Sequence, residues 1–332
     1  MFFNIKRGKM KAVINNEYGD PDVLRIAEIE KPVVNEDELL IKIHYTTATT
    51  VDSTFRKGDS FFARLFTGAF KPKKNVLGGE FSGVVEETGK SVTSFKKGDK
   101  VWGGAPDGFG AYAEYIKVNR NDAVSLIPDG VSFDFAAASY GALTALPFLR
   151  DEGKIEKGMQ VLINGASGSI GSFAVQLAKF YDCEVTALCS PRNFELVKSL
   201  GADYAFDYSS PEISGQLKKY DIIFDAVGKT SFGKTKRYLK KNGRYLTTVV
   251  TPAILWQKLF TRFIGGKKAI IAFTGLRSAN EKLRDMDFVN KLMSIGKLKP
   301  LIDREYDIQQ IRAAHGYVDK GHKRGNVVIK LI

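Results

Sequence analysis

Three evenly spaced glycines are the feature of this sequence with the clearest chemical use. The segment INGASGSIG places Gly165, Gly168 and Gly171 between an apolar run, QVLIN, and a segment with helical spacing, SFAVQLAKF. A strand that turns tightly into a helix needs residues without a Cβ, and bare backbone lets a pyrophosphate approach closely. The helix N-terminus then offers unpaired N–H groups and a partial positive charge. The pattern predicts a variant dinucleotide-binding turn, with a plain tight turn as the alternative.

The end of the next expected strand indicates which dinucleotide would bind. Proteins that use NAD usually carry an Asp or Glu about 20 residues further on, where it binds the ribose 2′-hydroxyl. Here no acidic residue occurs from Val185 to Phe194, and Ser190 and Arg192 stand in that region. A guanidinium can bind a 2′-phosphate through two hydrogen bonds, whereas a carboxylate would repel it. The sequence therefore predicts NADPH, with a solvated surface arginine as the alternative.

The cysteines and histidines form no pattern typical of a disulfide or a metal site. Cys183 and Cys189, the only cysteines, enclose the strand-like run CEVTALC. An extended strand would hold them about 20 Å apart, whereas a disulfide needs Cα atoms within roughly 7 Å. His44, His315 and His322 lie in no tight cluster with another His or a Cys. A structural zinc site made of thiolates is excluded, and both cysteines are expected to be core thiols.

Two kinds of pattern divide the chain into the elements that would position these residues. At 332 residues the chain is long enough for two domains. Before Pro128, short runs rich in β-branched and aromatic residues alternate with Gly, Asp and Asn, which is typical of a β-rich, barrel-like domain. After Pro128, apolar strands alternate with helical segments, which predicts parallel βαβ units in a doubly wound sheet. An amphipathic helix over 281–298 and a strand over 324–332 are expected to return to the first domain.

Composition excludes several classes of protein. Apolar residues make up 44% of the chain and charged residues 26%, the usual balance of a globular protein with a large core, so disorder is not expected. No stretch approaches the ~18 uncharged apolar residues of a transmembrane helix. The start, MFFNIKRGKMK, has no apolar segment after its basic residues, so no secretory signal is expected. The expected location is a reducing cytoplasm.

Taken together, these segments resemble the medium-chain dehydrogenase/reductase superfamily and, within it, the zinc-independent quinone oxidoreductase branch. The resemblance extends from Met10 to Ile332. The segments that carry it are MKAVINNEYGDPDVL, GGEFSGVVEETGKSVTSFKKGDKVWG, GAYAEYI, AAASYGALTAL, VLINGASGSIGSFAVQLAK, LGADYAFDY, YDIIFDAVG and RGNVVIKL. It implies an α/β protein with a GroES-like β-rich substrate domain over 1–138, completed by 279–332. A Rossmann doubly wound parallel-sheet domain over 139–278 would bind NADPH. A homodimer is also expected.

The resemblance implies cofactor contacts by position within the matching motifs. The implied residues are Thr144 at the nicotinamide end; Gly165, Ser167, Gly168, Ser169, Ile170 and Gly171 at the pyrophosphate turn; Ser190, Arg192 and Tyr208 at the 2′-phosphate; and Val227, Val250, Phe273 and Asn326 along the rest of the path.

Both zinc sites of the wider family are expected to be absent. Zinc-dependent relatives place a Cys near TTATTVD and a His before the Glu of a GHE-like motif, and this chain has Thr49 and Gly79 there. Glu80 is then expected to have a structural role in its turn. Quinone reductases of this branch commonly have an Asn in place of Thr49, so Thr49 is the candidate for polarising the substrate, against a packing role. Asp52 is expected to cap a short helix over 53–58.

The resemblance implies hydride transfer from NADPH to a quinone or an α,β-unsaturated carbonyl. Conjugation in such acceptors spreads the developing negative charge, so they need neither a Lewis-acid metal nor an activated base. The protein would then supply proximity and orientation, and water could supply the proton. Two alternatives stay open. One is a zinc-free reductase of the alcohol or aldehyde dehydrogenase type, and the other is a redox sensor that binds NADPH without catalysis.

The basic residues raise the question of a macromolecular partner. The net charge of +13 is concentrated in KPKK, KTKRYLKK and GHKR and near the N-terminus. No nucleic-acid motif accompanies it, so solvated faces and attraction for an anionic cofactor are favoured over nucleic-acid binding. The segment TPAILWQKLFTRFIGGKK could cover the cleft, form a subunit interface or contact a membrane surface through 252–264, and the first two are favoured. Its apolar residues are Ile254, Leu255, Leu259, Phe260, Phe263 and Ile264.

Overall fold

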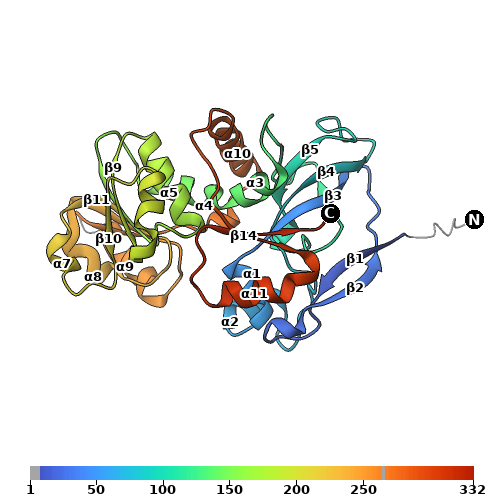
Figure 1. Ribbon diagram of the computed structural model, residues 1–332, viewed down its shortest axis with the longest axis horizontal. Helices are drawn as coiled ribbons and strands as arrows, with labels where there is room; N and C mark the ends of the chain where they lie inside the picture. Colours follow the sequence, from blue (N-terminus) through green and yellow to red (C-terminus); the bar gives the residue numbers. More distant parts are fainter. Residues whose placement is uncertain (1–7, 264–265) are drawn as a thin grey trace, which may run out of the picture. The chain divides into compact units, whose positions relative to one another are not determined.

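A computed structural model describes residues 8–263 and 266–332, and the chain divides into two compact units (Figure 1). Unit 1 comprises Met1–Tyr140, Ala279–Ser294 and Ile302–Ile332, and unit 2 comprises Gly141–Ser278 and Ile295–Leu301. The last segment differs from the expected division, in which 279–332 as a whole completes the first domain. The side chain of Gln176 binds both the backbone N–H and the carbonyl of Lys299, which attaches this segment to unit 2.

Unit 2 is built around a parallel sheet, and the alternation of apolar strands and helices after Pro128 predicts that architecture. In the described residues the sheet has six strands in the order β10-β9-β8-β11-β12-β13, all parallel. The chain builds outward from β8 in one direction and then returns to add β11 on its other side, so the order reverses between β8 and β11. The strands are β8 Gln160–Asn164, β9 Glu184–Cys189, β10 Tyr204–Asp207, β11 Tyr220–Asp225, β12 Leu239–Thr247 and β13 Lys268–Ile271.

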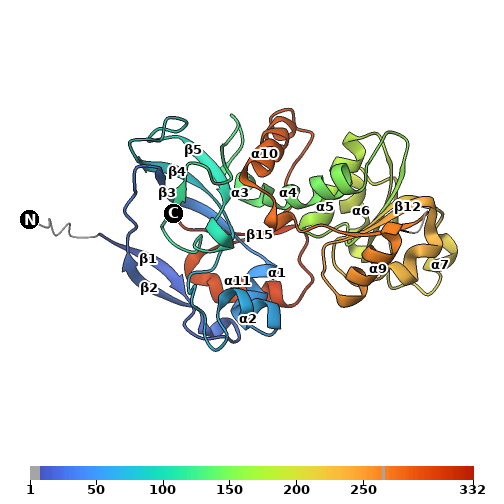
Figure 2. The same ribbon diagram turned by 180° about the vertical axis from the view of Figure 1, so that it is seen from behind.

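The helices of unit 2 follow its strands and cover the sheet. The longest are α5 and α9, both labelled in Figure 2. α9 packs against the edge strand β13. Apolar side chains from the strands and from Ile254 of α9 form one buried cluster. The helices are α4 Ala142–Pro147, α5 Ser169–Phe180, α6 Phe194–Ser199, α7 Ile213–Gln216, α8 Phe232–Thr235 and α9 Pro252–Phe263.

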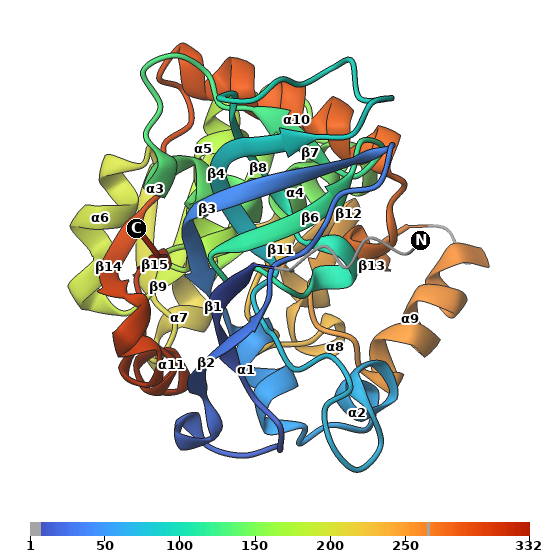
Figure 3. The ribbon, with the colours of Figure 1, turned by 90° about the vertical axis from the view of Figure 1, so that its right-hand side faces the viewer.

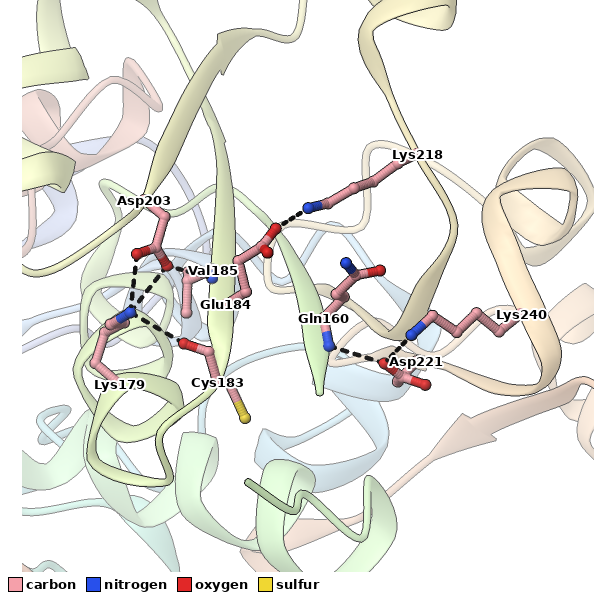
Figure 4. A network of polar contacts seen from close by, with 9 residues as sticks. All are labelled: Gln160, Lys179, Cys183, Glu184, Val185, Asp203, Lys218, Asp221 and Lys240. Atoms are coloured by element: carbon pink, nitrogen blue, oxygen red, sulfur yellow. Dashed lines mark hydrogen bonds and ion pairs between the residues drawn. The ribbon is translucent and has the colours of Figure 1, made fainter. Parts of the chain in front are cut away.

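Ion pairs hold the amino ends of the strands in unit 2 (Figure 4). Asp203 accepts hydrogen bonds from Lys179 and from the backbone N–H of Val185. Glu184 pairs with Lys218, and Asp221 pairs with Lys240 at 2.7 Å. All of these contacts lie at the amino ends of the strands. The glycine turn lies at the opposite ends, because it follows the carboxyl end of β8.

Unit 1 is β-rich, as the short glycine-punctuated runs predict. Its larger sheet has the order β14-β15-β3-β4-β5-β7, with β6 also paired to β3, and β1 pairs with β2 in a separate hairpin (Figure 3). The final strand β15 pairs with β3, so the chain end does return to the first unit. The strands are β1 Lys9–Ile14, β2 Arg25–Glu30, β3 Glu38–Ala48, β4 Glu80–Thr88, β5 Lys100–Gly104, β6 Tyr115–Asn119, β7 Val124–Leu126, β14 Ile302–Asp307 and β15 Asn326–Lys330.

The helices of unit 1 include two that the sequence analysis did not identify. The segment from Gly58 to Asn75 contains α2, and the region before β15 contains α11. The helix expected over 53–58 begins earlier, at Thr50. The helices are α1 Thr50–Lys57, α2 Phe61–Thr67, α3 Phe133–Ala138, α10 Ala279–Ser294 and α11 Ile311–Asp319.

The two cysteines behave as the extended run between them predicts. Cys183 directly precedes β9 and Cys189 ends it, and both are free and buried. Burial raises the pKa of each thiol to about 11, so both stay protonated at neutral pH.

Candidate functional site

The glycine turn after β8 is held in a shape that only glycine at position 165 allows. Gly165 has a φ of +79°, and a Cβ there would lie 2.5 Å from Cγ1 of Val227. The backbone N–H groups of Gly165 and Ala166 both donate to the carbonyl of Leu188 on the neighbouring strand. The turn is therefore fixed against β9 before any ligand arrives.

The other two glycines serve different purposes. A Cβ on Gly171 would lie 2.1 Å from the carbonyl oxygen of Gly165, so helix and turn pack backbone against backbone. Gly168 has an extended backbone with a φ of −83°, and its Cβ would meet only the Gly165 carbonyl, at 3.3 Å. It occupies the N-cap of α5, yet it brings no side chain to cap the helix. The first N–H groups of α5, beside the half-buried Ser169 and Ile170, therefore face a position suited to an anion.

A buried asparagine links this turn to the loop after β9. Nδ2 of Asn193 donates to Oγ of Ser167 at 3.0 Å, and only 4% of Asn193 is exposed. The link fixes the short turn Pro191–Asn193, which carries Arg192. Sequence reasoning missed Asn193, because nothing in its local pattern distinguishes it from an ordinary residue at the start of a helix.

Ser190 and Tyr208 meet at the carboxyl ends of β9 and β10. The hydroxyls of Ser190 and Tyr208 lie 3.3 Å apart, because Asp207 of β10 pairs with Cys189 of β9. Arg192 follows two residues later in an exposed position. The carboxylate of Asp207 accepts two hydrogen bonds from Ser209, so it is engaged within its own loop. This corner presents hydroxyls and a guanidinium.

A buried carboxylate organises the point where the strand order reverses. Asp225 ends β11 and accepts hydrogen bonds from Nδ2 of Asn164 at the end of β8 and from the N–H of Gly228. It also accepts one from the hydroxyl of Tyr245, whose pKa is raised by burial and by the Asp225 charge. These bonds shape the loop that holds Val227 against the glycine turn. The sequence does contain a signal for this pair, since a polar residue ends each of the apolar runs VLIN and IIFD.

The remaining predicted cofactor residues of unit 2 lie near the same edge of the sheet or on α4. Val227, Val250 and Phe273 follow β11, β12 and β13, and each is 43–48% exposed. Solvent-exposed apolar side chains in a row at the carboxyl edge can pack against a ribose or nicotinamide. Thr144 is half-buried on α4, which packs against α5.

Two predicted residues, Thr49 and Asn326, belong to unit 1, and they come together at one end of its sheet. Ala48 of β3 pairs with Val327 of β15, so Thr49 and the buried Asn326 are the next residues along the two strands. Thr49 is the N-cap of α1, and its hydroxyl donates to Oδ2 of Asp52 at 2.6 Å. Asp52 completes a capping box as the third helical residue, which corrects the expectation that it precedes the helix. The hydroxyl proton of Thr49 is thus committed to Asp52.

Glu80 begins β4 in unit 1 and is hydrogen-bonded to the neighbouring strand β3, as a structural role requires. Its carboxylate accepts a 2.6 Å hydrogen bond from Oγ1 of Thr47. Burial raises the pKa of Glu80 to about 7, and the nearby charge of Lys323 opposes that rise. Burial also lowers the pKa of Lys323 to about 8. Glu80 can therefore hold or release a proton near neutral pH.

A buried histidine in unit 1 has its protonation state fixed by its neighbours. Nη1 of Arg56 lies 2.9 Å from Nδ1 of His315, and a guanidinium can only donate. Nδ1 is therefore an acceptor, and Nε2–H donates to the hydroxyl of Tyr112 at 3.0 Å. Burial, aided by the Arg56 charge, lowers the pKa of His315 to about 3. The ring is a neutral link between Arg56 and Tyr112.

This histidine predicts a pH dependence of stability. Between pH 6.5 and about 3 the unfolded chain binds a proton at His315 that the folded chain does not, so the free energy of unfolding falls as the pH falls. A His315→Gln variant keeps an acceptor and a donor without titrating. We expect the loss of unfolding free energy from pH 7 to pH 5 to shrink by about 2 kcal/mol in this variant. Urea unfolding at both pH values measures it, and the exposed His322→Gln is the control. An unchanged loss in His315→Gln would show that this ring does not remain neutral.

Within residues 8–263 and 266–332, no three His, Cys, Asp or Glu side chains are grouped so as to hold a metal ion. Over the same residues, no helix combines the length and the apolarity that crossing a bilayer requires.

A β-rich unit and a dinucleotide-type parallel sheet in one chain are the architecture expected of a nicotinamide-dependent dehydrogenase or reductase, and comparison with known proteins agrees. The alcohol dehydrogenase GroES-like domain family matches residues 35–129, and the zinc-binding dehydrogenase family matches residues 200–329. The human mitochondrial NAD(P)H oxidoreductase RTN4IP1 is 32% identical over 97% of this chain and 89% of its own length. The chloroplastic NADPH-dependent alkenal/one oxidoreductase of Arabidopsis thaliana is 30% identical over 97% of this chain and 79% of its own.

Solved structures agree with these relatives. The quinone oxidoreductase from Coxiella burnetii superposes with a TM-score of 0.86 at 28% identity, over 98% of this chain and all of its own. The chain belongs to the medium-chain dehydrogenase/reductase superfamily, in its quinone oxidoreductase branch. It is an oxidoreductase that uses a nicotinamide cofactor and acts on a small molecule. The predicted GroES-like and Rossmann folds are confirmed.

Proposed function

We propose that this protein is an NADPH-dependent reductase of quinones or α,β-unsaturated carbonyls that works without a metal ion. The observation that carries the proposal is the corner formed by Ser190, Arg192 and Tyr208 beside the glycine turn. That turn leads into α5, whose N-cap residue has no side chain. A 2′-phosphate fits the corner, and a pyrophosphate fits the open end of α5. The Arabidopsis relative, whose name states NADPH dependence, supports the same cofactor.

The choice of acceptor rests on the ligand chemistry available near Thr49. Where zinc-dependent relatives are expected to have Cys and His, this chain has Thr49 and Gly79, and Thr49 already gives its proton to Asp52. A conjugated acceptor suits such a site, because its own π-system spreads the charge that forms on reduction. The bound reduced nicotinamide supplies the hydride. The protein binds and orients both molecules, and water supplies the proton.

A panel of acceptors tests this function. Purified protein and NADPH are mixed with a quinone, an enone or an aldehyde, and in a separate assay the protein and NADP⁺ are mixed with an alcohol. The NADPH absorbance is followed in each assay with and without a chelator. We expect turnover of the quinone or the enone that the chelator does not change. Turnover that requires added zinc would contradict the proposal. NADPH binding with no turnover of any acceptor would favour a sensor instead.

Replacing Arg192 with glutamate tests the cofactor assignment. Losing a guanidinium–phosphate contact and adding repulsion should raise the KM for NADPH by about 100-fold, whereas the KM for NADH should change less than about 3-fold. Steady-state kinetics with each cofactor measures both. Lys198→Glu, which makes the same charge change on α6, is the control and should leave both values near wild type. Equal effects of Arg192→Glu on the two cofactors would contradict the 2′-phosphate role.

Four further expectations stay predictions. They are a homodimer, a cytoplasmic location, a catalytic part for Thr49, and cofactor contacts at Thr144, Val250, Phe273 and Asn326.

A further inference from the structure

Helix α9 of unit 2 buries one side and leaves the other side apolar and exposed. Ile254 is 4% exposed and joins the core cluster of the sheet. Helical spacing places the exposed residues on the opposite side, where Trp256 and Phe260 form a ring pair at 6.2 Å. The exposed apolar residues, here called the α9 face, are Leu255, Trp256, Leu259, Phe260 and Phe263. Ile264, which the sequence analysis grouped with them, lies outside the described residues.

The α9 face is remote from the glycine turn within unit 2. α9 packs on the edge strand β13, and two strands separate β13 from β8. At about 4.8 Å per strand, the edge lies roughly 14 Å across the sheet from the turn. The α9 face is therefore separate from the glycine turn, and its roles as a cover for the cleft or as a subunit interface stay predictions.

A basic hollow lies at the end of the sheet toward which α9 runs. Its volume is about 750 Å³, and its lining includes Lys219, Lys236, Lys240, Lys241 and Lys267. α9 ends at Phe263, and β13 begins at Lys268, so Lys267 connects the helix end to the hollow. Lys240 is paired with Asp221 (Figure 4), and the backbone carbonyl of Lys236 accepts a hydrogen bond from Nζ of Lys267. The side chains of Lys236 and Lys241 form no ion pair or hydrogen bond with the part of the chain that the structure describes.

We propose that the α9 face and the basic hollow together bind the surface of an anionic lipid bilayer. Exposed Trp, Phe and Leu can enter the region between headgroups and acyl chains, while adjacent lysines attract anionic headgroups. A second copy of the chain fits less well, because a two-fold contact through this surface would bring its lysines against those of the partner. A nucleic acid would match the lysines but leave Leu259 and Phe263 without a partner. The inference does not depend on the proposed reaction. It would place the protein at a surface where apolar acceptors are concentrated.

Vesicle flotation of the full chain tests this surface. The probes are vesicles of phosphatidylcholine alone and of phosphatidylcholine mixed with phosphatidylglycerol. We expect wild type to float with the anionic vesicles only, and less so at high salt. Phe260→Ser with Phe263→Ser should weaken binding more than about 10-fold. Lys236→Gln with Lys241→Gln should weaken it about 30-fold, at roughly 5-fold per lysine. Lys90→Gln with Lys96→Gln, an equal charge change on unit 1, should bind like wild type.

Three results would overturn the proposal. The first is no flotation of wild type with anionic vesicles. The second is equal flotation of the Phe260→Ser, Phe263→Ser variant and wild type, with thermal unfolding showing that both are folded. The third is that the same variant changes a dimer into a monomer in sedimentation without affecting flotation, which would assign the surface to a second copy. Binding of single-stranded RNA by wild type, together with the first result, would assign the surface to nucleic acid. NADPH affinity serves as the check on unit 2 in every variant.

Discussion

Replacing Gly168 with aspartate is expected to lower the affinity for NADPH more than about 100-fold while leaving the protein folded. Gly168 is the N-cap of α5, its backbone is extended, and the nearest atom to an added Cβ is the Gly165 carbonyl oxygen, at 3.3 Å. Aspartate is a favoured N-cap residue, so its side chain should stabilise the helix relative to glycine by roughly a few tenths of a kcal/mol. The same carboxylate would occupy and repel the position proposed for the pyrophosphate. Calorimetric titration measures the affinity, and thermal unfolding measures the stability.

Gly168→Ser is the matched control for this change. Serine adds the same Cβ and also caps the helix, but it carries no charge. We expect Gly168→Ser to bind NADPH clearly better than Gly168→Asp, at similar stability. Equal affinities in the two variants would mean that no anion lies at this helix end. A loss of folding in both would mean that Gly168, like Gly171, is needed for backbone packing.

The second large effect is expected for stability, at Arg56. Its side chain is fully buried and binds the carbonyl of Gly19, Nδ1 of His315 and the carboxylate of Asp319 at 2.6 Å. Arg56→Met keeps much of the volume but leaves the Asp319 charge and the His315 acceptor without this partner. Breaking a buried ion pair in this way typically costs about 3–5 kcal/mol. The free energy of unfolding of unit 1, followed in denaturant, should fall by that amount.

Lys57→Met provides a control on the same helix. Lys57 also pairs with Asp319, at 3.3 Å, but one third of its side chain is exposed. Water screens such a pair, so the variant should lose less than about 1 kcal/mol. If Arg56→Met lost no more unfolding free energy than Lys57→Met, the buried network around Arg56 would not stabilise unit 1 as expected.

The glycine turn and the parallel sheet could be predicted because their causes are local. Gly165 and Gly171 are required by the backbone within a seven-residue segment, and apolar runs alternating with helical spacing dictate parallel βαβ units. The same reasoning brought Ser190 and Arg192 to one strand end, and the family resemblance implied Tyr208 beside them. The pairing of β9 with β10 explains how Tyr208 reaches Ser190.

The polar residues that end the runs VLIN and IIFD mark Asn164 and Asp225, but the pairing of the supporting residues could not be predicted, because their partners lie far away in the sequence. Asn193 meets Ser167 across 26 residues, Asp225 meets Asn164 across 61, and His315 meets Arg56 across 259. No periodicity encodes such pairs. The α9 segment is an intermediate case: composition revealed its apolar and basic residues, but only the packing of Ile254 shows which side is left exposed.

Calorimetric titration of the purified wild-type protein with NADPH and, separately, with NADH tests the central claim most directly. The account predicts one NADPH bound per chain, at least about 10-fold tighter than NADH, because Ser190, Arg192 and Tyr208 add contacts that only a 2′-phosphate can make. No heat with either nucleotide, or tighter binding of NADH, would contradict it.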